Sequence, residues 1–122
     1  MQRSRILIID DEPGLVRVMT LMLVSTERYD VSSVLEGTLA LNAVVKFKPH
    51  LVLLDWVMPR ISGAEVARQI RADSRVCDTP ILVLSAVAKA TESELGGFPA
   101  ICKPIGIHEL VEAIEEQLRK AG

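Results

Sequence analysis

Three consecutive acids, Asp10, Asp11 and Glu12, follow a short apolar run and directly precede Pro13. Neighbouring carboxylates repel and raise one another's pKa, so such a group is costly unless a cation offsets its charge. Mg²⁺ is the natural candidate, because it binds through one or two carboxylates together with waters and phosphate oxygens. The alternative is that Asp10 and Asp11 cap the helix that begins at Pro13 and complement its dipole.

Three further polar residues also follow apolar runs. Asp55 follows Leu51–Leu54, Ser85 follows Ile81–Leu84, and Lys103 follows the weaker run Ala100–Cys102. Taken singly, Asp55 suits a turn, and Ser85 and Lys103 suit solvated or locally hydrogen-bonded positions. Taken together with a divalent cation, a carboxylate nucleophile, a hydroxyl and an ammonium form a phosphoryl-transfer site that works through a covalent aspartyl phosphate.

The elements that must position these residues alternate along the chain. We expect strands over residues 6–9, 31–35, 51–54, 81–84 and 100–102. One helix should start at Pro13, and a second should cover residues 41–45 and stop at Pro49. A third should cover residues 64–71, and the last should run from Ile107 to Leu118. This alternation predicts an α/β fold with a doubly wound, five-stranded parallel sheet in the flavodoxin-like order 2-1-3-4-5. In that order, one rim beyond the carboxyl ends of the strands brings together Asp10, Asp11, Asp55, Ser85 and Lys103.

The bulk composition limits the class of protein. A chain of 122 residues, 49% hydrophobic and 25% charged, predicts one domain spanning residues 1–122. The net charge of -2 and the scattered basic residues argue against direct nucleic-acid binding. No apolar run reaches membrane-spanning length, and Ile6–Ile9 is too short for a signal peptide. The isolated thiols of Cys77 and Cys102 fit a reducing compartment, so we expect a cytoplasmic location.

Four motifs, "IIDDEP", "LLDWVMPRISG", "PILVLSA" and "CKP", occur in this order over the whole chain. Together they resemble the response-regulator receiver domain of two-component signalling. The resemblance implies that Asp55 accepts a phosphoryl group from a histidine kinase or phosphotransfer protein, and that the domain is not a dedicated enzyme. It also implies that Mg²⁺ is held by Asp10, Asp11, Asp55 and the backbone carbonyl of Val57.

The same resemblance assigns roles at the ends of the last two strands. It implies that Ser85 binds a phosphoryl oxygen and moves on activation, that Lys103 pairs with the phosphate, and that the Lys103–Pro104 peptide is cis. Histidines His50 and His108 lie away from the predicted rim, so we expect both at the surface.

The sequence departs from the family pattern in the segment between Ser85 and Lys103. Ala100 stands three residues before Lys103, where relatives often carry an aromatic that moves with the hydroxyl. The segment also looks short, and "ATESELGG" predicts a shortened fourth helix. We therefore expect a remodelled output face that signals through backbone shifts rather than through Phe98, because Pro99 disfavours regular strand geometry there.

Two other functions fit parts of the pattern. The first is an aspartyl-phosphate phosphatase on a related sheet. Phosphatases of the haloacid-dehalogenase type usually carry a second acid two residues after the nucleophile. This chain has Val57 at that position, which counts against this alternative. The second is a receiver-like docking module that is never phosphorylated. Such a module is expected to lack one of the acids or the lysine, and this chain retains all of them. Because the chain ends at Gly122, soon after its last helix, we expect no output domain within it.

Overall fold

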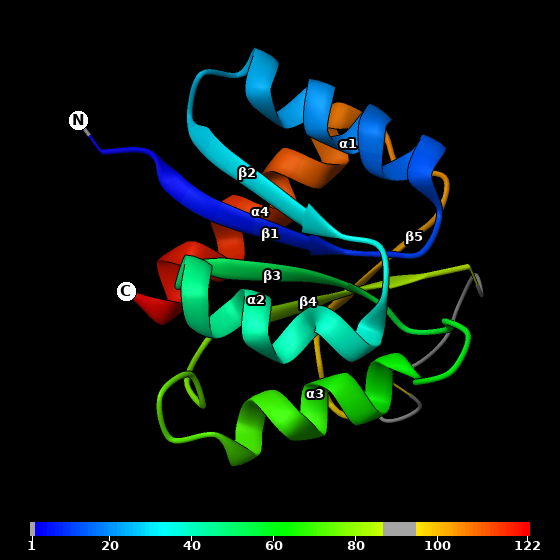
Figure 1. Ribbon diagram of the computed structural model, residues 1–122. Coiled ribbons are helices and arrows are strands. Elements are labelled where there is room, and N and C mark those ends of the chain that lie inside the picture. The colour runs from blue at the N-terminus through cyan, green and yellow to red at the C-terminus, as the bar shows by residue number, and fades with distance from the viewer. Residues whose placement is uncertain (1, 87–94) are drawn as a thin grey trace.

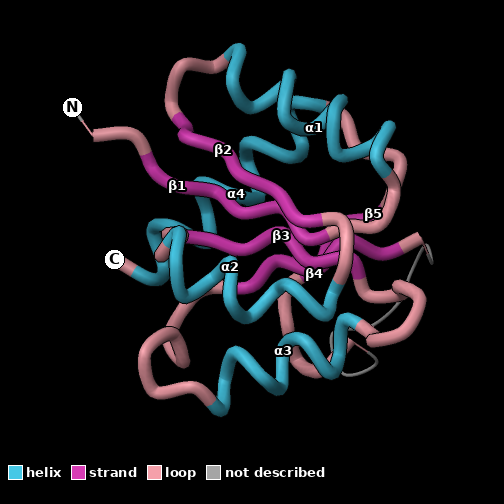
Figure 2. Tube along the Cα trace, in the orientation of Figure 1, coloured by secondary structure: helices cyan, strands magenta, loops and turns pink. Residues whose placement is uncertain are grey.

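The computed structural model describes residues 2–86 and 95–122, which fold around a parallel five-stranded sheet of order β2-β1-β3-β4-β5 (Figures 1 and 2). The elements in chain order are β1 (Ser4–Ile9), α1 (Pro13–Ser25), β2 (Tyr29–Val34), the 3₁₀ helix η1 (Gly37–Leu39), α2 (Ala40–Phe47), β3 (Leu51–Asp55), α3 (Gly63–Ala72), β4 (Ile81–Ser85), β5 (Ala100–Cys102) and α4 (Ile107–Ala121). The predicted fold class and strand order are confirmed.

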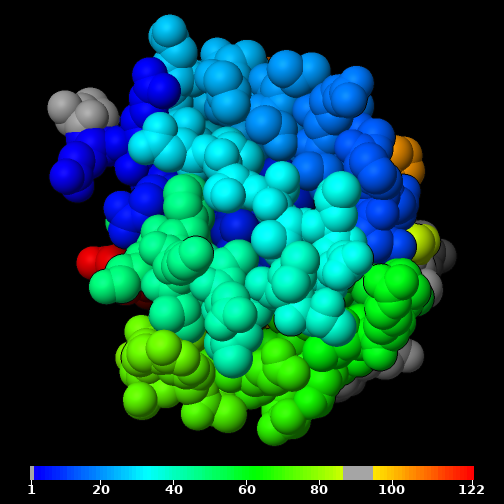
Figure 3. Space-filling view, in the orientation of Figure 1, coloured from blue at the N-terminus to red at the C-terminus, as the bar shows by residue number. Residues whose placement is uncertain are grey.

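The central strands are continuous aliphatic runs because helices cover both faces of the sheet. Every residue of β3 and of β4 is buried. Helices α2 and α3 pack on one face, and α1 and α4 pack on the other (Figure 1). Figure 3 shows α1 in the upper part of the molecule and α2 and α3 in the lower part, with most of the sheet hidden between and behind them. The sheet is thus a rigid layer between two apolar cores, and only its rims are available for polar chemistry.

Side chains of alternate residues along each strand enter opposite cores. In β1, Leu7 and Ile9 pack with α2 and α3, whereas Ile6 and Ile8 pack with α1 and α4. Burying a side chain of this size contributes about 1.5–3 kcal/mol relative to leaving it exposed. The two cores together therefore fix the register that brings the strand ends to one rim.

Several predicted boundaries need correction. The second strand begins at Tyr29 rather than at residue 31, because Tyr29 is buried and pairs in register with Ser4 of β1. It ends at Val34, one residue before the predicted end. Helix α2 ends at Phe47, before Pro49: Lys48 takes a left-handed conformation, with φ of 49°, and its amide donates to the Val44 carbonyl. The helix η1 was not predicted.

The predicted shortened fourth helix falls mostly on residues that the structure does not describe. Residues 90–94 of that segment lie outside the described ranges, and residues 95–97 form a turn in which Gly96 and Gly97 have positive φ angles. The label α4 therefore belongs to the amphipathic C-terminal helix predicted from Ile107 onwards. Within residues 2–86 and 95–122, none of the helices has the length and apolar character that crossing a membrane requires.

Candidate functional site

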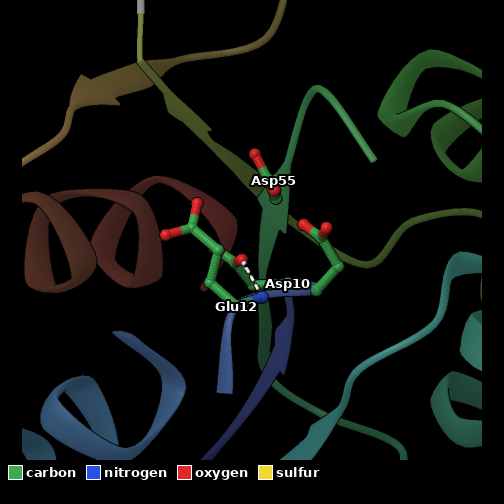
Figure 4. Close-up of side chains that lie close together, drawn as sticks. Asp10, Glu12 and Asp55 are labelled. Carbon is green, nitrogen blue, oxygen red and sulfur yellow. Dashed lines mark hydrogen bonds between the residues drawn. The ribbon is translucent and has the colours of Figure 1, made fainter. Parts of the chain in front are cut away.

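The ends of four strands meet at one rim, as the sequence predicted. Asp10 directly follows β1, Asp55 is the last residue of β3, Ser85 is the last residue of β4, and Lys103 directly follows β5. Figure 4 shows the side chains of Asp10, Glu12 and Asp55 close together beyond the ends of β1 and β3. Residues that are distant in the sequence thus form one polar site at the carboxyl edge of the sheet.

Four carboxylates make up the acidic part of this site. Oxygens of Asp10, Asp11, Glu12 and Asp55 all lie within 4.8 Å of one another. Asp10 is fully buried and Asp55 is 4% exposed, although both side chains are ionisable. The Glu12 amide donates to Asp10 Oδ1 over 3.0 Å (Figure 4), and the Val57 amide lies 3.4 Å from Asp55 Oδ1. The acids are therefore placed by the backbone of the loops that follow β1 and β3.

Lys103 supplies the positive charge of the site. Its Nζ lies 3.0 Å from Asp10 Oδ2, 3.1 Å from Glu12 Oε1 and 3.3 Å from Asp55 Oδ1. Burial lowers the pKa of Lys103, but the contacts with Asp10 and Glu12 and the charge of Asp55 outweigh it and raise the pKa to about 12. The lysine is thus a permanent cation that faces three carboxylates at once.

The carboxyl group of Asp55 has a raised pKa. Burial, followed by the charge of Asp10, raises its pKa to about 7, and the charge of Lys103 opposes this rise only in part. A buried carboxylate beside another carboxylate is destabilised in its charged form, which is the physical cause of both contributions. Added positive charge at this rim would therefore favour the ionised form of Asp55.

The donor set fits a hard divalent cation. Asp10 Oδ2 is enclosed and accepts no hydrogen bond of good geometry from any described residue, although Lys103 Nζ lies 3.0 Å away. Leaving a buried carboxylate oxygen without such a partner is costly. The single ammonium of Lys103 contacts three of the four clustered carboxylates, and all the donors are oxygens, the ligands that Mg²⁺ prefers. The predicted metal ligands Asp10, Asp11 and Asp55 are thus brought together, and Val57 lies in the loop directly after β3.

The prediction that Asp10 or Asp11 is the N-cap residue of α1 is wrong. The residue at the N-cap of α1 is Glu12, and its side chain makes no capping hydrogen bond. Pro13 is the first residue of the helix, as predicted. The sequence identified Glu12 as part of the acidic run but gave it no role. Its place among the four clustered carboxylates and its 3.1 Å contact with Lys103 mark it as a site residue.

Gly63 fixes the path of the chain beyond Asp55. Its amide donates to the Trp56 carbonyl over 2.9 Å, and a Cβ atom at this position would lie 2.6 Å from Trp56 Cα and against the Asp55 carbonyl oxygen. Ser62 caps α3 by accepting a hydrogen bond from the Glu65 amide. The start of α3 therefore packs directly against the backbone of Asp55 and Trp56, which only a glycine permits.

The ends of β4 and β5 agree in part with the sequence prediction. The Lys103–Pro104 peptide is cis, and the Lys103 amide donates to the Ser85 carbonyl over 2.8 Å. Ala100 is exposed in β5, opposite Val83 of β4. His50 and His108 are exposed, as predicted. The Arg5 amide donates to His50 Nδ1 near the start of β1, at the end of the sheet opposite the rim.

A comparison with protein families identifies the family to which this fold belongs. The family model described as "Response regulator receiver domain" matches residues 6–115. The chain belongs to this family. The family recognised from the four sequence motifs is confirmed.

Two curated relatives show how this receiver domain compares with longer proteins. The DNA-binding response regulator MtrA of Mycolicibacterium smegmatis is 37% identical over 122 residues, which cover 97% of this chain and 52% of MtrA. The probable transcriptional regulator ycf27 of Porphyridium aerugineum is 37% identical, over 98% of this chain and 50% of its own. The receiver domain described here spans about half the length of these relatives.

Solved structures share the whole fold of this receiver domain. A sensor protein from Polaromonas sp. JS666 superimposes with a TM-score of 0.90 and 28% identity over 99% of this chain and 100% of its own. The receiver domain of the sensor histidine kinase PA1611 of Pseudomonas aeruginosa PAO1, solved with a magnesium ion coordinated in its active site cleft, has a TM-score of 0.86 and 25% identity over 97% of this chain and 99% of its own. The chemotaxis protein CheY4 of Vibrio cholerae, at 22% identity and a TM-score of 0.86, supports the fold alone.

Proposed function

We propose that this receiver domain accepts a phosphoryl group on Asp55 from a histidine kinase or a histidine phosphotransfer protein, and that the modification changes its output surface. The observation that carries the proposal is the position of Asp55, at the end of β3 and 3.3 Å from the ammonium of Lys103, among three other carboxylates. A carboxylate nucleophile beside a fixed cation is the arrangement that aspartyl phosphorylation needs.

The metal that fits this rim is Mg²⁺. Asp10, Asp11, Asp55 and the backbone carbonyl of Val57 would hold it, in keeping with the buried Oδ2 of Asp10, which accepts no hydrogen bond from residues 2–86 or 95–122, and with the magnesium ion in the PA1611 receiver domain. When bound, Mg²⁺ supplies positive charge that neutralises phosphoryl oxygens and the acidic cluster. The remaining chemistry belongs to the protein's own side chains.

The transfer step follows from the positions of these side chains. A carboxylate oxygen of Asp55 attacks the phosphorus of a phosphohistidine, so that an O–P bond forms while the N–P bond breaks and its electron pair returns to the imidazole. Lys103 contacts a phosphoryl oxygen as a point charge, and Ser85 donates a hydrogen bond to another. Attack of water on the same phosphorus breaks the O–P bond and releases inorganic phosphate and the free carboxylate.

The signalling role extends beyond the transfer itself. The relatives MtrA and ycf27 are named as a DNA-binding response regulator and a probable transcriptional regulator, and this chain matches about half of each. We infer that residues 1–122 form a cytoplasmic receiver unit that changes its own phosphorylation state, rather than a dedicated enzyme acting on other substrates. Its output then passes to a downstream partner or to another domain, and not through direct contact of this unit with nucleic acid.

Incubation with acetyl phosphate and Mg²⁺ tests the proposal. We expect one phosphoryl adduct by intact mass, mapped to Asp55, stable to acid and labile to base, as an acyl phosphate is. Asp55→Asn should carry no adduct, and Asp30→Asn, which changes an exposed carboxylate in β2, should be labelled like the wild type. Absence of any adduct on the folded wild-type protein would favour a docking module that acts without phosphorylation.

A further inference from the structure

Glu12 differs from the other acids of the rim in how it is held. Its side chain is 60% exposed, whereas that of Asp10 is fully buried and that of Asp55 is 6% exposed. It stands at the N-cap of α1, yet it makes no capping hydrogen bond and extends to Lys103 instead, with Oε1 3.1 Å from Nζ. The side chain of Glu12 is therefore placed by its ion pair with the lysine and not by the helix.

The three carboxylates around Lys103 are not equally free to leave. Asp10 is enclosed, and its Oδ1 accepts the amide of Glu12, so its withdrawal would break a buried contact. Asp55 ends a strand in the middle of the sheet and is itself the acceptor in the proposed reaction. Glu12 alone among the three can turn into solvent, because its side chain is 60% exposed, whereas the lysine that it contacts is only 12% exposed.

We propose that Glu12 is a releasable counter-ion that occupies Lys103 in the unphosphorylated domain and lowers its affinity for phosphoryl groups. The inference rests on the proposed function, since it assigns Lys103 to the phosphoryl group. An incoming phosphoryl oxygen needs the donor that Glu12 holds, and it carries the same sign of charge as the Glu12 carboxylate. Glu12 therefore leaves Lys103 when the phosphoryl group arrives, and Asp10 stays. Glu12 acts as a positioning residue through the lysine rather than as a metal ligand.

Binding of beryllofluoride, a phosphoryl mimic, at saturating Mg²⁺ tests this role. We expect Glu12→Gln to bind the mimic about two- to fivefold more tightly than the wild type, because the mimic no longer has to displace a carboxylate from Lys103. The matched control is Glu36→Gln, which removes the same charge from another exposed glutamate, one that pairs with Arg60 over 3.3 Å. The control should bind the mimic like the wild type.

A second measurement follows Lys103 directly, by NMR of protein with ¹³Cε-labelled lysines. Glu12→Gln should shift the Lys103 signal of the free protein and leave that of the mimic-bound protein unchanged, because the pair exists only in the free state. Equal tightening by Glu36→Gln, unchanged affinity of Glu12→Gln, or equal shifts in both states would overturn the inference. If wild-type protein failed to bind the mimic at all, the proposed function would be wrong instead.

Discussion

The ring of Trp56 lies against the ring of Phe98, with centroids 6.3 Å apart and planes inclined by 58°. Trp56 directly follows Asp55, and Phe98 lies two residues before β5, so the pair joins the loop after β3 to the segment that leads to Lys103. The guanidinium carbon of Arg71 lies 5.3 Å from the centre of the Phe98 ring, and a Cβ atom at Gly96 would come within 3.1 Å of the indole. Phe98 is thus a packed, half-buried side chain outside the strand.

This contact leads to a prediction about Phe98→Ala. The indole of Trp56 loses cover, so its emission should shift to longer wavelength in the free protein. The beryllofluoride-dependent change in amide exchange at Ser85 should persist, because Phe98 lies outside β5 and does not pair with β4. Loss of that change while the mimic still binds would show that Phe98 is the moving aromatic in place of Ala100.

Trp56 is the only tryptophan and should report metal binding. Because the acidic cluster includes its neighbour Asp55, addition of Mg²⁺ should change its fluorescence with a saturable response. Asp11→Asn should weaken the response, since it removes one predicted ligand. Titration of both proteins measures this, and equal midpoints and amplitudes in the two would contradict the assigned metal site.

The raised pKa of Asp55 predicts how stability depends on pH without a metal. Between pH 3.8, its ordinary pKa, and about 7, the folded state holds a proton that the unfolded state has lost, so the free energy of unfolding falls as the pH rises through this window. Asp55→Asn cannot ionise. At pH 8 the variant should therefore be more stable than the wild type by about 2 kcal/mol, or several degrees of Tm. At pH 5 this difference in stability should be smaller.

Thermal unfolding in the presence of a chelator measures this difference. Asp30→Asn is the control, because Asp30 is exposed and lies 4.0 Å from Arg3, far from the rim. It should show no such gain between pH 5 and pH 8. A constant difference between Asp55→Asn and the wild type over this range would mean that Asp55 is ionised throughout.

Lys103→Ala should separate metal binding from phosphoryl binding. Without the ammonium, Asp10 and Asp55 are left without their cation, and breaking a buried pair of this kind costs about 3–5 kcal/mol. Mg²⁺ should restore much of this loss and bind at least as tightly as to the wild type, whereas the affinity for beryllofluoride should fall. Thermal unfolding and Trp56 fluorescence measure both effects. A loss of Mg²⁺ affinity as large as the loss of beryllofluoride affinity would place the lysine in the metal site instead.

Tyr29, the only tyrosine, predicts the behaviour at high pH. Burial, and then the hydrogen bond that its hydroxyl donates to Glu115, raise its pKa well above the ordinary value of 10.0. The stability that this shift contributes is fully present below pH 10.0 and is lost as the pH rises above it. Tyrosinate absorbance should therefore appear only with alkaline unfolding, and Tyr29→Phe should lose less stability over that range. Ionisation of Tyr29 in the folded protein near its ordinary pKa would contradict this.

Much of the fold was predictable because its signals are local. The runs Ile6–Ile9, Leu51–Leu54 and Ile81–Leu84 are apolar without alternation, as strands buried on both faces require, and the handedness of βαβ units leaves few possible strand orders. The start of β2 was not predicted, because its strand structure depends on contacts that are distant in the sequence. Tyr29 and Asp30 do not look like a buried strand, and only the pairing of Tyr29 with Ser4 and its packing in the core make them one.

The sequence by itself determined which residues end the strands and hence which ones share the rim: Asp10, Asp11, Asp55, Ser85 and Lys103. Only the tertiary structure decided how they interact. Glu12 and Lys103 stand 91 positions apart, and their contact depends on where β1 and β5 end relative to each other. The high pKa of Asp55 likewise comes from burial and from the charge of Asp10 on a neighbouring strand. Local sequence sets the path of each strand, but electrostatic interactions act through space, so they exist only once the strands are assembled.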